Sequence, residues 1–305
     1  MRTRTKTAHL KLGASLVARL RAALAEDVRR GDVTSQATIG AGARGRAVVR
    51  AKKSGVVCGL TVASAVFRLA DRRVRCVPKA ADGDRVRLGG VVMEIAGPLR
   101  AILLAERVAL NFVQRMSGVA TLTARYVEAV KGTRAGIYDT RKTNPLWRDL
   151  DRYAVRCGGG QNHRYCLDDM ILIKDNHIDA AGSVGEAVRR ARQWRQAGKG
   201  IRRRLKIMAE TRNLDEVRQA LEAGADFTML DNMNNAQIRR AVALVGRWTN
   251  RTDRTGRTGS RVPVEVSGGV TVARARTLAR LGVGRISVGA ITHSAPSLDI
   301  SLLIR

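Results

Sequence analysis

Short apolar runs alternate with helical periodicity along the second half of the chain. Six runs of strand length occur, at Ile137-Tyr138, Met170–Ile173, Leu205–Ala209, Phe227–Leu230, Val262–Val266 and Ile286–Val288. Between them, apolar residues recur every three or four positions near 145–157, 183–196, 213–223, 235–245 and 271–281, which predicts helices. Repeated strand–helix units require right-handed crossovers and a parallel sheet. Six strands fall short of the eight of a full barrel, so the pattern predicts an open or incomplete α/β barrel.

The first hundred residues follow a different pattern. Leu16, Leu20 and Leu24 form one apolar stripe and predict an amphipathic helix from Ser15 to Val28. Further along, the pattern predicts a strand pair over 44–58 broken at Ser54-Gly55, a helix over 60–69, and strands at 73–77 and 85–95. These elements favour an α+β, sandwich-like domain with a mainly antiparallel sheet and helices on one side.

A largely apolar helical region begins after Pro98 and carries one conspicuous cation, Arg107. On spacing alone, a lone arginine on such a helix is more often a solvated or salt-bridged residue. Gly118 is expected to divide this helix from the next, Ala120–Val130. We therefore expect an N-terminal α+β domain over residues 1–117 and an α/β barrel over residues 118–294.

Composition excludes several classes of protein. The hydrophobic fraction of 45% excludes a disordered chain, and no stretch approaches eighteen uninterrupted apolar residues, so no membrane span is predicted. The four cysteines form no CxxC motif. Cys157 and Cys166 flank His163, but this spacing matches no standard zinc site, and the neighbouring arginines would oppose a cation. We expect free thiols and a cytoplasmic location.

The net charge of +30 is far above what one active site requires. It predicts nonspecific attraction to polyanions. Much of the excess lies in arginine-rich segments, such as residues 202–204 and the run Gly246–Arg261. A nucleic-acid-binding protein built on an enzyme fold is therefore an alternative, although aromatic residues make up only 3% of the chain and no nucleic-acid-binding motif is present.

Cationic side chains are concentrated between Asp139 and His177. The members of this cluster are Arg141, Lys142, His163, Arg164 and Lys174. Asn144 and Pro145 suit the first positions of a helix that ends before the run Gly158–Gly160. Arg141 and Lys142 would then lie beside a helix N-terminus, where free N–H groups already favour anions. The sequence predicts an anion-binding site here.

Polar residues follow each predicted strand, and the carboxyl ends of parallel strands meet at one rim. The cationic cluster follows the first two strands, Glu210 and Asp231 follow the next two, and the last two are followed by Ser267, Gly268, Gly269, Gly289 and His293. Two carboxylates suit Mg²⁺ bridging to substrate phosphates, and glycines let backbone N–H groups approach a phosphate. Taken alone, the glycines fit simple turns, the carboxylates fit salt bridges, and His163 fits a core position.

Seven segments in order carry a specific resemblance. They read EDVRRGDVTS, AERVALNFVQRMSGVAT, YDTRKT, YAVRCGGGQNHR, ILIKDNHI, MLDN and SVGAITHSAPSLDISL, between Glu26 and Leu302. Together they resemble the quinolinate phosphoribosyltransferase family. The resemblance implies a pentosyltransferase of NAD biosynthesis that converts quinolinate and phosphoribosyl pyrophosphate into nicotinate mononucleotide, pyrophosphate and CO₂. It also implies the open α/β barrel, with residues 295–305 returning to the first domain.

Residue roles follow from the resemblance. Arg107 would reach the active site of the neighbouring subunit in a homodimer. With Arg107, the two ring carboxylates would be held by Arg141, His163, Arg164 and Lys174. Lys142 would lie near the reacting ribose and pyrophosphate, and Glu210 and Asp231 would be catalytic and hold Mg²⁺. The 5′-phosphate would be received by Ser267, Gly268, Gly269, Gly289 and His293.

Three departures from the family pattern leave other acceptors open. Leu146 stands where the family has glycine, Met208 where it has an acidic residue, and Tyr165-Cys166-Leu167 in place of a glycine-containing turn. A divergent paralogue acting on another aromatic acid is one alternative. A related enzyme that uses nicotinate itself is another, although it would release no CO₂ and would need fewer carboxylate-binding cations.

Overall fold

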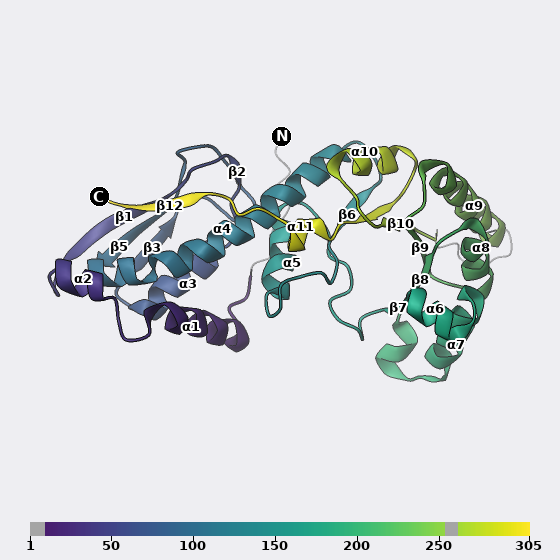
Figure 1. The fold of residues 1–305 in the computed structure, drawn as a ribbon, viewed down its shortest axis with the longest axis horizontal. Coiled ribbons are helices and arrows are strands. Elements are labelled where there is room, and N and C mark those ends of the chain that lie inside the picture. The colour runs from purple at the N-terminus through teal and green to yellow at the C-terminus, as the bar shows by residue number, and fades with distance from the viewer. Residues whose placement is uncertain (1–9, 254–261) are drawn as a thin grey trace. The chain divides into compact units, whose positions relative to one another are not determined.

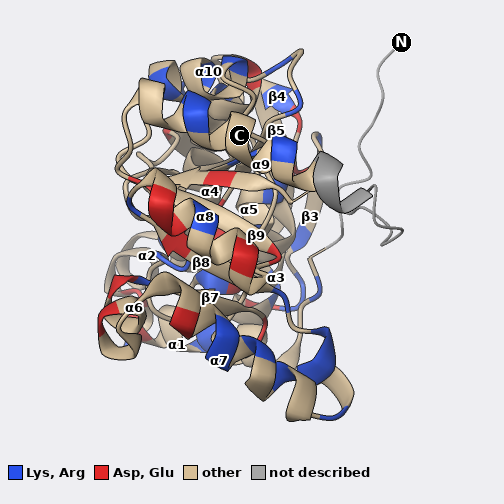
Figure 2. Cartoon of the chain, turned by 90° about the vertical axis from the view of Figure 1, so that its right-hand side faces the viewer, with Lys and Arg blue, Asp and Glu red and all other residues tan. Residues whose placement is uncertain are grey.

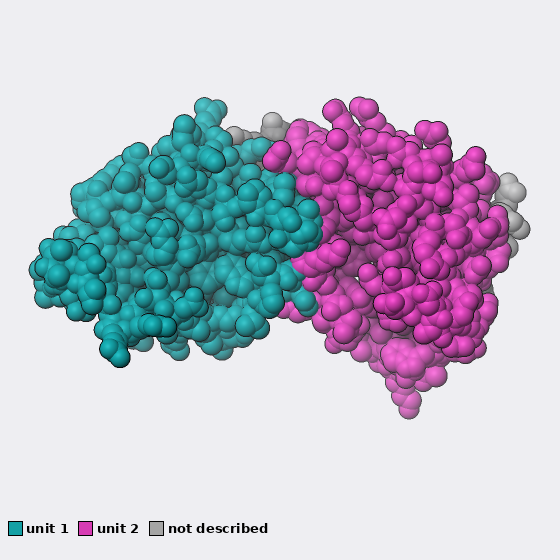
Figure 3. All heavy atoms as spheres, viewed as in Figure 1, with its two compact units in different colours: residues 1–124, 143–160, 290–305 teal, residues 125–142, 161–289 magenta. Residues whose placement is uncertain are grey.

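The computed structural model describes residues 10–253 and 262–305. The chain falls into two compact units, coloured separately in Figure 3. Unit 1 comprises the residues up to Ala124, Thr143–Gly160 and Ala290–Arg305, and unit 2 comprises Arg125–Lys142 and Gln161–Gly289. Residues 254–261 of the arginine-rich run Gly246–Arg261 lie outside the described residues.

Unit 1 is built on an antiparallel four-stranded sheet. Its order is β12 (Ile300–Ile304), β1 (Arg44–Ala51), β5 (Val91–Pro98) and β3 (Arg75–Pro78). The C-terminal strand therefore returns to the sheet of the first hundred residues. The predicted strand pair across Ser54-Gly55 is wrong, because β2 (Gly55–Val56) pairs with β4 (Arg85–Val86) instead of with β1.

The helices of unit 1 include the predicted long apolar helix. The helices of this unit are α1 (Ala14–Val28), α2 (Val33–Thr38), α3 (Leu60–Ala70), α4 (Leu99–Ala129), α5 (Arg148–Cys157) and α11 (Ala290–His293), and the residues of α4 from Arg125 onward belong to unit 2. The predicted division at Gly118 is wrong, because α4 passes through it unbroken. A Cβ at Gly118 would lie 2.1 Å from the carbonyl oxygen of Pro296, so this glycine permits close packing of the C-terminal segment.

Helix α5 begins later than the sequence predicts. It starts at Arg148 with Trp147 as its N-cap, and Leu146 has a φ of 62° that no helix interior allows. Trp147 stacks on Phe112 with ring centroids 4.8 Å apart, which fixes the entry to the helix. Residues 143–147 thus separate Lys142 from the first turn. The prediction that Arg141 and Lys142 adjoin a helix N-terminus is wrong.

Unit 2 contains the predicted six-stranded parallel sheet. The strands are β6 (Gly136–Tyr138), β7 (Ile171–Ile173), β8 (Ile207–Thr211), β9 (Phe227–Asp231), β10 (Val264–Ser267) and β11 (Arg285–Ser287), in the order β6-β11-β10-β9-β8-β7. The first strand therefore pairs with the last, and β6 and β7 form the two edges. This arrangement confirms an open α/β barrel.

Helices cover the outer side of this sheet (Figure 1). They are α6 (Asp175–Ala181), α7 (Val184–Ala197), α8 (Leu214–Ala223), α9 (Asn235–Asp253) and α10 (Val272–Arg280), with a 3₁₀ turn, η1 (Gly200–Arg204), after α7. Ile207 and Ala209 of β8 belong to the apolar cluster beneath α7 and α8. Because side chains alternate along a strand, Met208 and Glu210 face the barrel interior. No helix in residues 10–253 or 262–305 has the length and apolar character needed to cross a membrane.

Candidate active site

Arg141 and Arg164, which both follow β6 in the chain, lie close enough for their positive charges to interact. Burial is the main effect that lowers the pKa of Arg164, and the nearby positive charge of Arg141 lowers it further. Arg164 donates a hydrogen bond from Nη1 to the carbonyl of Met170 at 3.0 Å, which fixes its guanidinium. The Nε of Arg141 is buried and has no hydrogen-bond partner. Two adjacent cations, one with an unused buried donor, form a site that an anion would stabilise.

A buried aspartate fixes the loop that carries Arg164. Asp139 is fully buried after β6 and accepts hydrogen bonds from Asn162 Nδ2 at 2.5 Å and from the backbone N–H of His163 at 2.6 Å. The main chain of this loop also pairs with β6, since Gln161 N donates to the carbonyl of Ile137 at 2.7 Å. Residues 161–164 are thus attached to the open edge of the barrel.

Both ring nitrogens of His163 face protein groups. Nδ1 accepts a hydrogen bond from the backbone N–H of Arg164 at 2.8 Å, and Nε2 lies 3.2 Å from a carboxylate oxygen of Glu265. The residue as a whole is 8% exposed. In the free chain, His163 thus positions the main chain of Arg164, and its expected contact with substrate remains a prediction.

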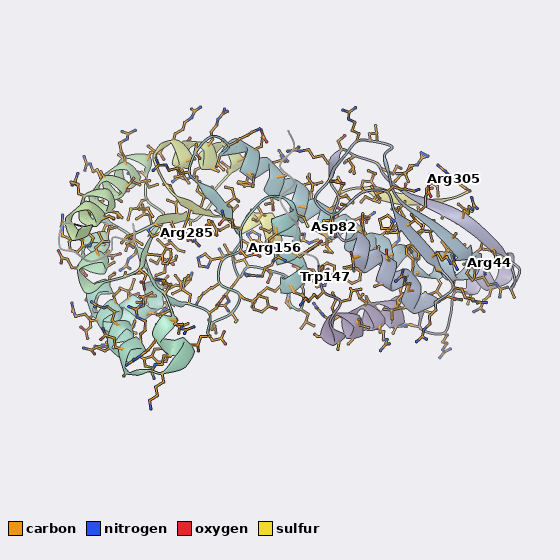
Figure 4. All side chains as sticks on the ribbon, turned by 180° about the vertical axis from the view of Figure 1, so that it is seen from behind. Arg44, Asp82, Trp147, Arg156, Arg285 and Arg305 are labelled. Atoms are coloured by element: carbon orange, nitrogen blue, oxygen red, sulfur yellow. The ribbon has the colours of Figure 1, made fainter. Side chains whose placement is uncertain are left out.

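Glu265 is a buried carboxylate that the sequence reasoning missed. It is fully buried on β10 and accepts hydrogen bonds from Arg285 Nε at 2.8 Å and Ser287 Oγ at 2.5 Å. Arg285, labelled in Figure 4, also lies over the ring of Tyr138 at 3.7 Å. The only available signal was an acidic residue inside an apolar run, VPVEV, which indicates a paired buried charge.

Lys174 and Glu210 meet at the ends of neighbouring strands. Lys174 is the N-cap of α6, and the His177 ring nitrogen Nδ1 accepts its backbone N–H at 3.1 Å. Its Nζ lies 3.5 Å from Glu210 Oε2. Burial is the largest effect on Glu210 and raises the pKa of its carboxyl, while the charge of Lys174 opposes that rise.

Asp231 extends this charged cluster across β9. Burial is the largest effect on Asp231 and raises the pKa of its carboxyl. The positive charges of Lys174 and Lys142 lower this pKa, and the negative charge of Asp175 raises it. Lys142 therefore belongs to the same electrostatic cluster. The carboxylate oxygens of Glu210 and Asp231 are the hard donors that Mg²⁺ prefers, so this donor set fits Mg²⁺ if water and phosphate oxygens complete the coordination. No group of three His, Cys, Asp or Glu side chains that could hold a metal occurs among the described residues.

Glycines line the ends of β10 and β11. Gly268 and Gly269 have φ values of 92° and 53°, and both are exposed. A Cβ at Gly268 would lie 2.9 Å from Asn232 Oδ1 and 3.1 Å from Asp231 Oδ1. The turn after Ser267 thus lies close to Asp231 and Asn232, and its glycines leave exposed backbone that a phosphate can approach.

The remaining predicted residues lie in unit 1. Arg107 is exposed on α4, and His293 is exposed at the end of α11, where its Nδ1 lies 2.6 Å from Ser294 Oγ. Unit 2 therefore contains every other predicted site residue: Arg141, Lys142, His163, Arg164, Lys174, Glu210, Asp231, Ser267, Gly268, Gly269 and Gly289.

Comparisons with known proteins identify the family. Residues 119–303 match the family model "Quinolinate phosphoribosyl transferase, C-terminal domain", and residues 32–117 match the corresponding N-terminal domain. The chain belongs to the quinolinate phosphoribosyltransferase family.

Relatives of this family resemble the chain over most of its length. A probable nicotinate-nucleotide pyrophosphorylase [carboxylating] from Bacillus subtilis (strain 168) is 40% identical, over 91% of this chain and 89% of that protein. A quinolinate phosphoribosyltransferase [decarboxylating] from Nicotiana glauca is 39% identical, over 92% of this chain and 80% of that protein. The crystal structure of NadC from Streptococcus pyogenes has a TM-score of 0.86 at 38% identity, covering 97% of this chain and 100% of that one.

Two of the departures from the family pattern have a structural account. Met208 is fully buried on the same face of β8 as Glu210, so an apolar side chain lies one step below the carboxylate inside the barrel. Leu146 is exposed in the turn before α5. Neither departure removes a charged group from the cluster of Lys142, Lys174, Glu210 and Asp231.

Proposed function

We propose that this chain catalyses the transfer of a phosphoribosyl group from phosphoribosyl pyrophosphate to quinolinate. The products are nicotinate mononucleotide, pyrophosphate and CO₂, so the reaction serves NAD biosynthesis. Relatives that match nearly the whole chain are named as a probable carboxylating nicotinate-nucleotide pyrophosphorylase and as a decarboxylating quinolinate phosphoribosyltransferase. The observation that carries the proposal is the pair Arg141 and Arg164, where a buried guanidinium N–H has no partner.

The acceptor has two carboxylates on adjacent ring carbons. Arg141 and Arg164 would bind them, since guanidinium groups form paired hydrogen bonds with carboxylate oxygens. Lys174 would add a third positive charge on the same rim, while the His163 ring holds the backbone of Arg164 in place. Binding both carboxylates fixes the ring nitrogen for attack on the ribose carbon that carries pyrophosphate.

The donor is the more highly charged substrate. Lys142 would screen the leaving pyrophosphate, and the backbone of Gly268, Gly269 and Gly289 would bind the 5′-phosphate. Glu210 and Asp231 would hold Mg²⁺, which supplies positive charge to the pyrophosphate oxygens. As pyrophosphate leaves, both carboxylates also stabilise the positive charge that develops on the ribose.

Loss of CO₂ follows from the charge created by ribosylation. Once the ring nitrogen carries the ribose, it is positive, and the bond to the neighbouring carboxylate can break with its electron pair remaining on the ring carbon. A proton then takes the place of the carboxylate. The protein's contribution is to hold the acceptor and screen its charges.

A homodimer is part of the proposal, with Arg107 acting in the partner's site. The support is that Arg107 is exposed on α4. Mixing inactive Arg107→Ala with inactive Lys142→Ala protein tests this. In mixed dimers one site contains neither substitution, so activity should return to about a quarter of the wild-type level. No recovery after subunit exchange would contradict shared sites.

Substitutions in the cationic cluster test the catalytic proposal. Lys142→Ala and Arg164→Ala should lose at least about a thousandfold in kcat/KM for quinolinate while their circular dichroism spectra stay unchanged. Arg239→Ala provides the matched control, because this arginine is exposed on α9. Near-normal turnover in Lys142→Ala or Arg164→Ala would refute the assignment.

A further inference from the structure

A strongly basic segment of unit 2 is not used by the proposed reaction. Residues 189–206, hereafter the basic segment, form the C-terminal part of α7, the turn η1 and the chain entering β8. Its nine cations are Arg189, Arg190, Arg192, Arg195, Lys199, Arg202, Arg203, Arg204 and Lys206, and it contains no acidic residue. Figure 2 shows basic residues along α7.

Two carboxylates neutralise only part of this segment. Glu186 pairs with Arg189 at 3.0 Å and Arg190 at 2.8 Å. Asp226 pairs with Arg195 at 2.6 Å and with Lys206 at 3.5 Å. No ion pair within the described residues is formed by Lys199, Arg202, Arg203 or Arg204. A bound anion would reduce the self-repulsion of such a cluster.

Two of the unpaired cations, Arg203 and Arg204, line open grooves. One groove of about 620 Å³ is lined by Arg195, Arg203, Arg204 and Lys206, with Asp226 also in its wall. A second, of about 360 Å³, shares Arg204 with the first and also has Asp168 and Asp169 in its wall, so the first groove is the more cationic of the two. Lys206 and Asp226 directly precede β8 and β9, so the grooves lie at the N-terminal ends of the strands. The predicted catalytic carboxylates lie at the opposite ends.

Exposed apolar side chains accompany these charges. Trp194 is 51% exposed, and the Arg202 guanidinium lies 3.6 Å from its ring centroid. A Cβ at Gly198 would lie 2.1 Å from Arg202 Cδ, so the arginine is held over the indole by close packing. Tyr165 and Ile201, which line the second groove, are also exposed. An aromatic surface beside unpaired cations suits a ligand with both planar bases and phosphates.

We propose that the basic segment binds single-stranded nucleic acid, with phosphates along Arg203 and Arg204 and a base against Trp194. The grooves are larger than a single phosphate requires. A single strand exposes the faces of its bases to an aromatic side chain, whereas a duplex does not. The proposal is independent of the catalytic function, because none of these residues belongs to the charged cluster at the other end of the sheet.

Fluorescence anisotropy with a labelled RNA tests the proposal. The probe is a fluorescein-labelled single-stranded RNA of about 16 nucleotides, matched to the site sizes of known single-strand binders. Two variants probe the site, Arg203→Ala/Arg204→Ala and Trp194→Leu. The control, Arg239→Ala/Arg240→Ala, removes the same charge from adjacent exposed arginines on α9. Quinolinate turnover should be the same in all four proteins, which shows that each variant is folded.

The expected results separate this site from general attraction by the +30 charge. The paired arginine variant should bind at least about fivefold more weakly, with the slope of log K against log salt reduced by about 1.4. Trp194→Leu should also bind about fivefold more weakly or worse. The control should change binding less than twofold. Duplex RNA and inorganic polyphosphate should compete poorly.

Three results would overturn the proposal. One is equal weakening by the control pair, which would show that the probe responds to net charge alone. Another is unchanged binding in Trp194→Leu, and the third is competition by polyphosphate as strong as by unlabelled RNA. Either of these last two would assign the grooves to phosphate groups without base recognition.

Discussion

Replacing Glu265 with glutamine tests the framework beneath His163. The carboxylate is fully buried and contacts Arg285 at 2.8 Å, Ser287 at 2.5 Å and His163 at 3.2 Å. Glutamine preserves the shape but replaces one acceptor oxygen with an NH₂ group that faces donors. Hydrogen bonds to charged groups contribute about 1.5–3 kcal/mol, and breaking a buried ion pair costs about 3–5 kcal/mol. We expect a loss of about 3 kcal/mol in the free energy of unfolding.

This loss should depend on pH in a defined direction. Burial is the largest effect on Glu265 and raises its pKa, but His163, Arg285 and Ser287 together outweigh it and lower the pKa below 4.5. Ionised Glu265 therefore stabilises the fold above the pKa of the unfolded chain, and that contribution is lost as the pH falls through the lower folded value. The difference in the free energy of unfolding between wild type and Glu265→Gln should therefore be largest near pH 7 and should decrease below about pH 4.5.

Urea denaturation followed by circular dichroism measures this difference. Glu222→Gln is the control, because Glu222 is an exposed carboxylate on α8 in the same unit. The control should change stability by less than about 0.5 kcal/mol at any pH. A Glu265→Gln protein as stable as the control at pH 7 would refute the reasoning, as would a difference that grows in acid.

Three further predictions concern the rim. Gly268→Ala should raise the KM for phosphoribosyl pyrophosphate about tenfold or more, because its Cβ would meet Asp231 Oδ1 at 3.1 Å and its φ is 92°. Gly269→Ala should change this KM by less than about fivefold, because φ is 53° at Gly269 and no atom lies within 4 Å of the added Cβ. Lys174→Gln should move the acid limb of activity to higher pH, since Lys174 opposes the burial that raises the pKa of Glu210. Removing Mg²⁺ with a chelator should stop turnover, and adding Mg²⁺ back should restore it.

The periodic pattern was sufficient to predict the barrel. Each of the six apolar runs overlaps one strand of the sheet, and an amphipathic helix follows each of the first five runs. The cluster of Lys142, Lys174, Glu210 and Asp231 was also predictable, because polar residues after parallel strands meet at one rim.

Long-range packing decided the features that the sequence pattern missed. Gly118 read as a helix break, yet it permits contact with Pro296, a residue far away in the chain. Pro145 read as the start of a helix, yet the stacking of Trp147 on Phe112 accompanies a later start. Glu265 lay inside an apolar run, and only the fold brings Arg285 and His163 to it. Local periodicity contains no information about such partners.

The most direct test of the account is CO₂ release by the purified protein. Quinolinate labelled in the carboxyl group next to the ring nitrogen is incubated with Mg²⁺, with and without phosphoribosyl pyrophosphate, and nicotinate is supplied in parallel as the acceptor. Labelled CO₂ and nicotinate mononucleotide should form in equal amounts, and only when phosphoribosyl pyrophosphate is present. Nucleotide formation from nicotinate without turnover of quinolinate, or no turnover of either acid, would contradict this expectation.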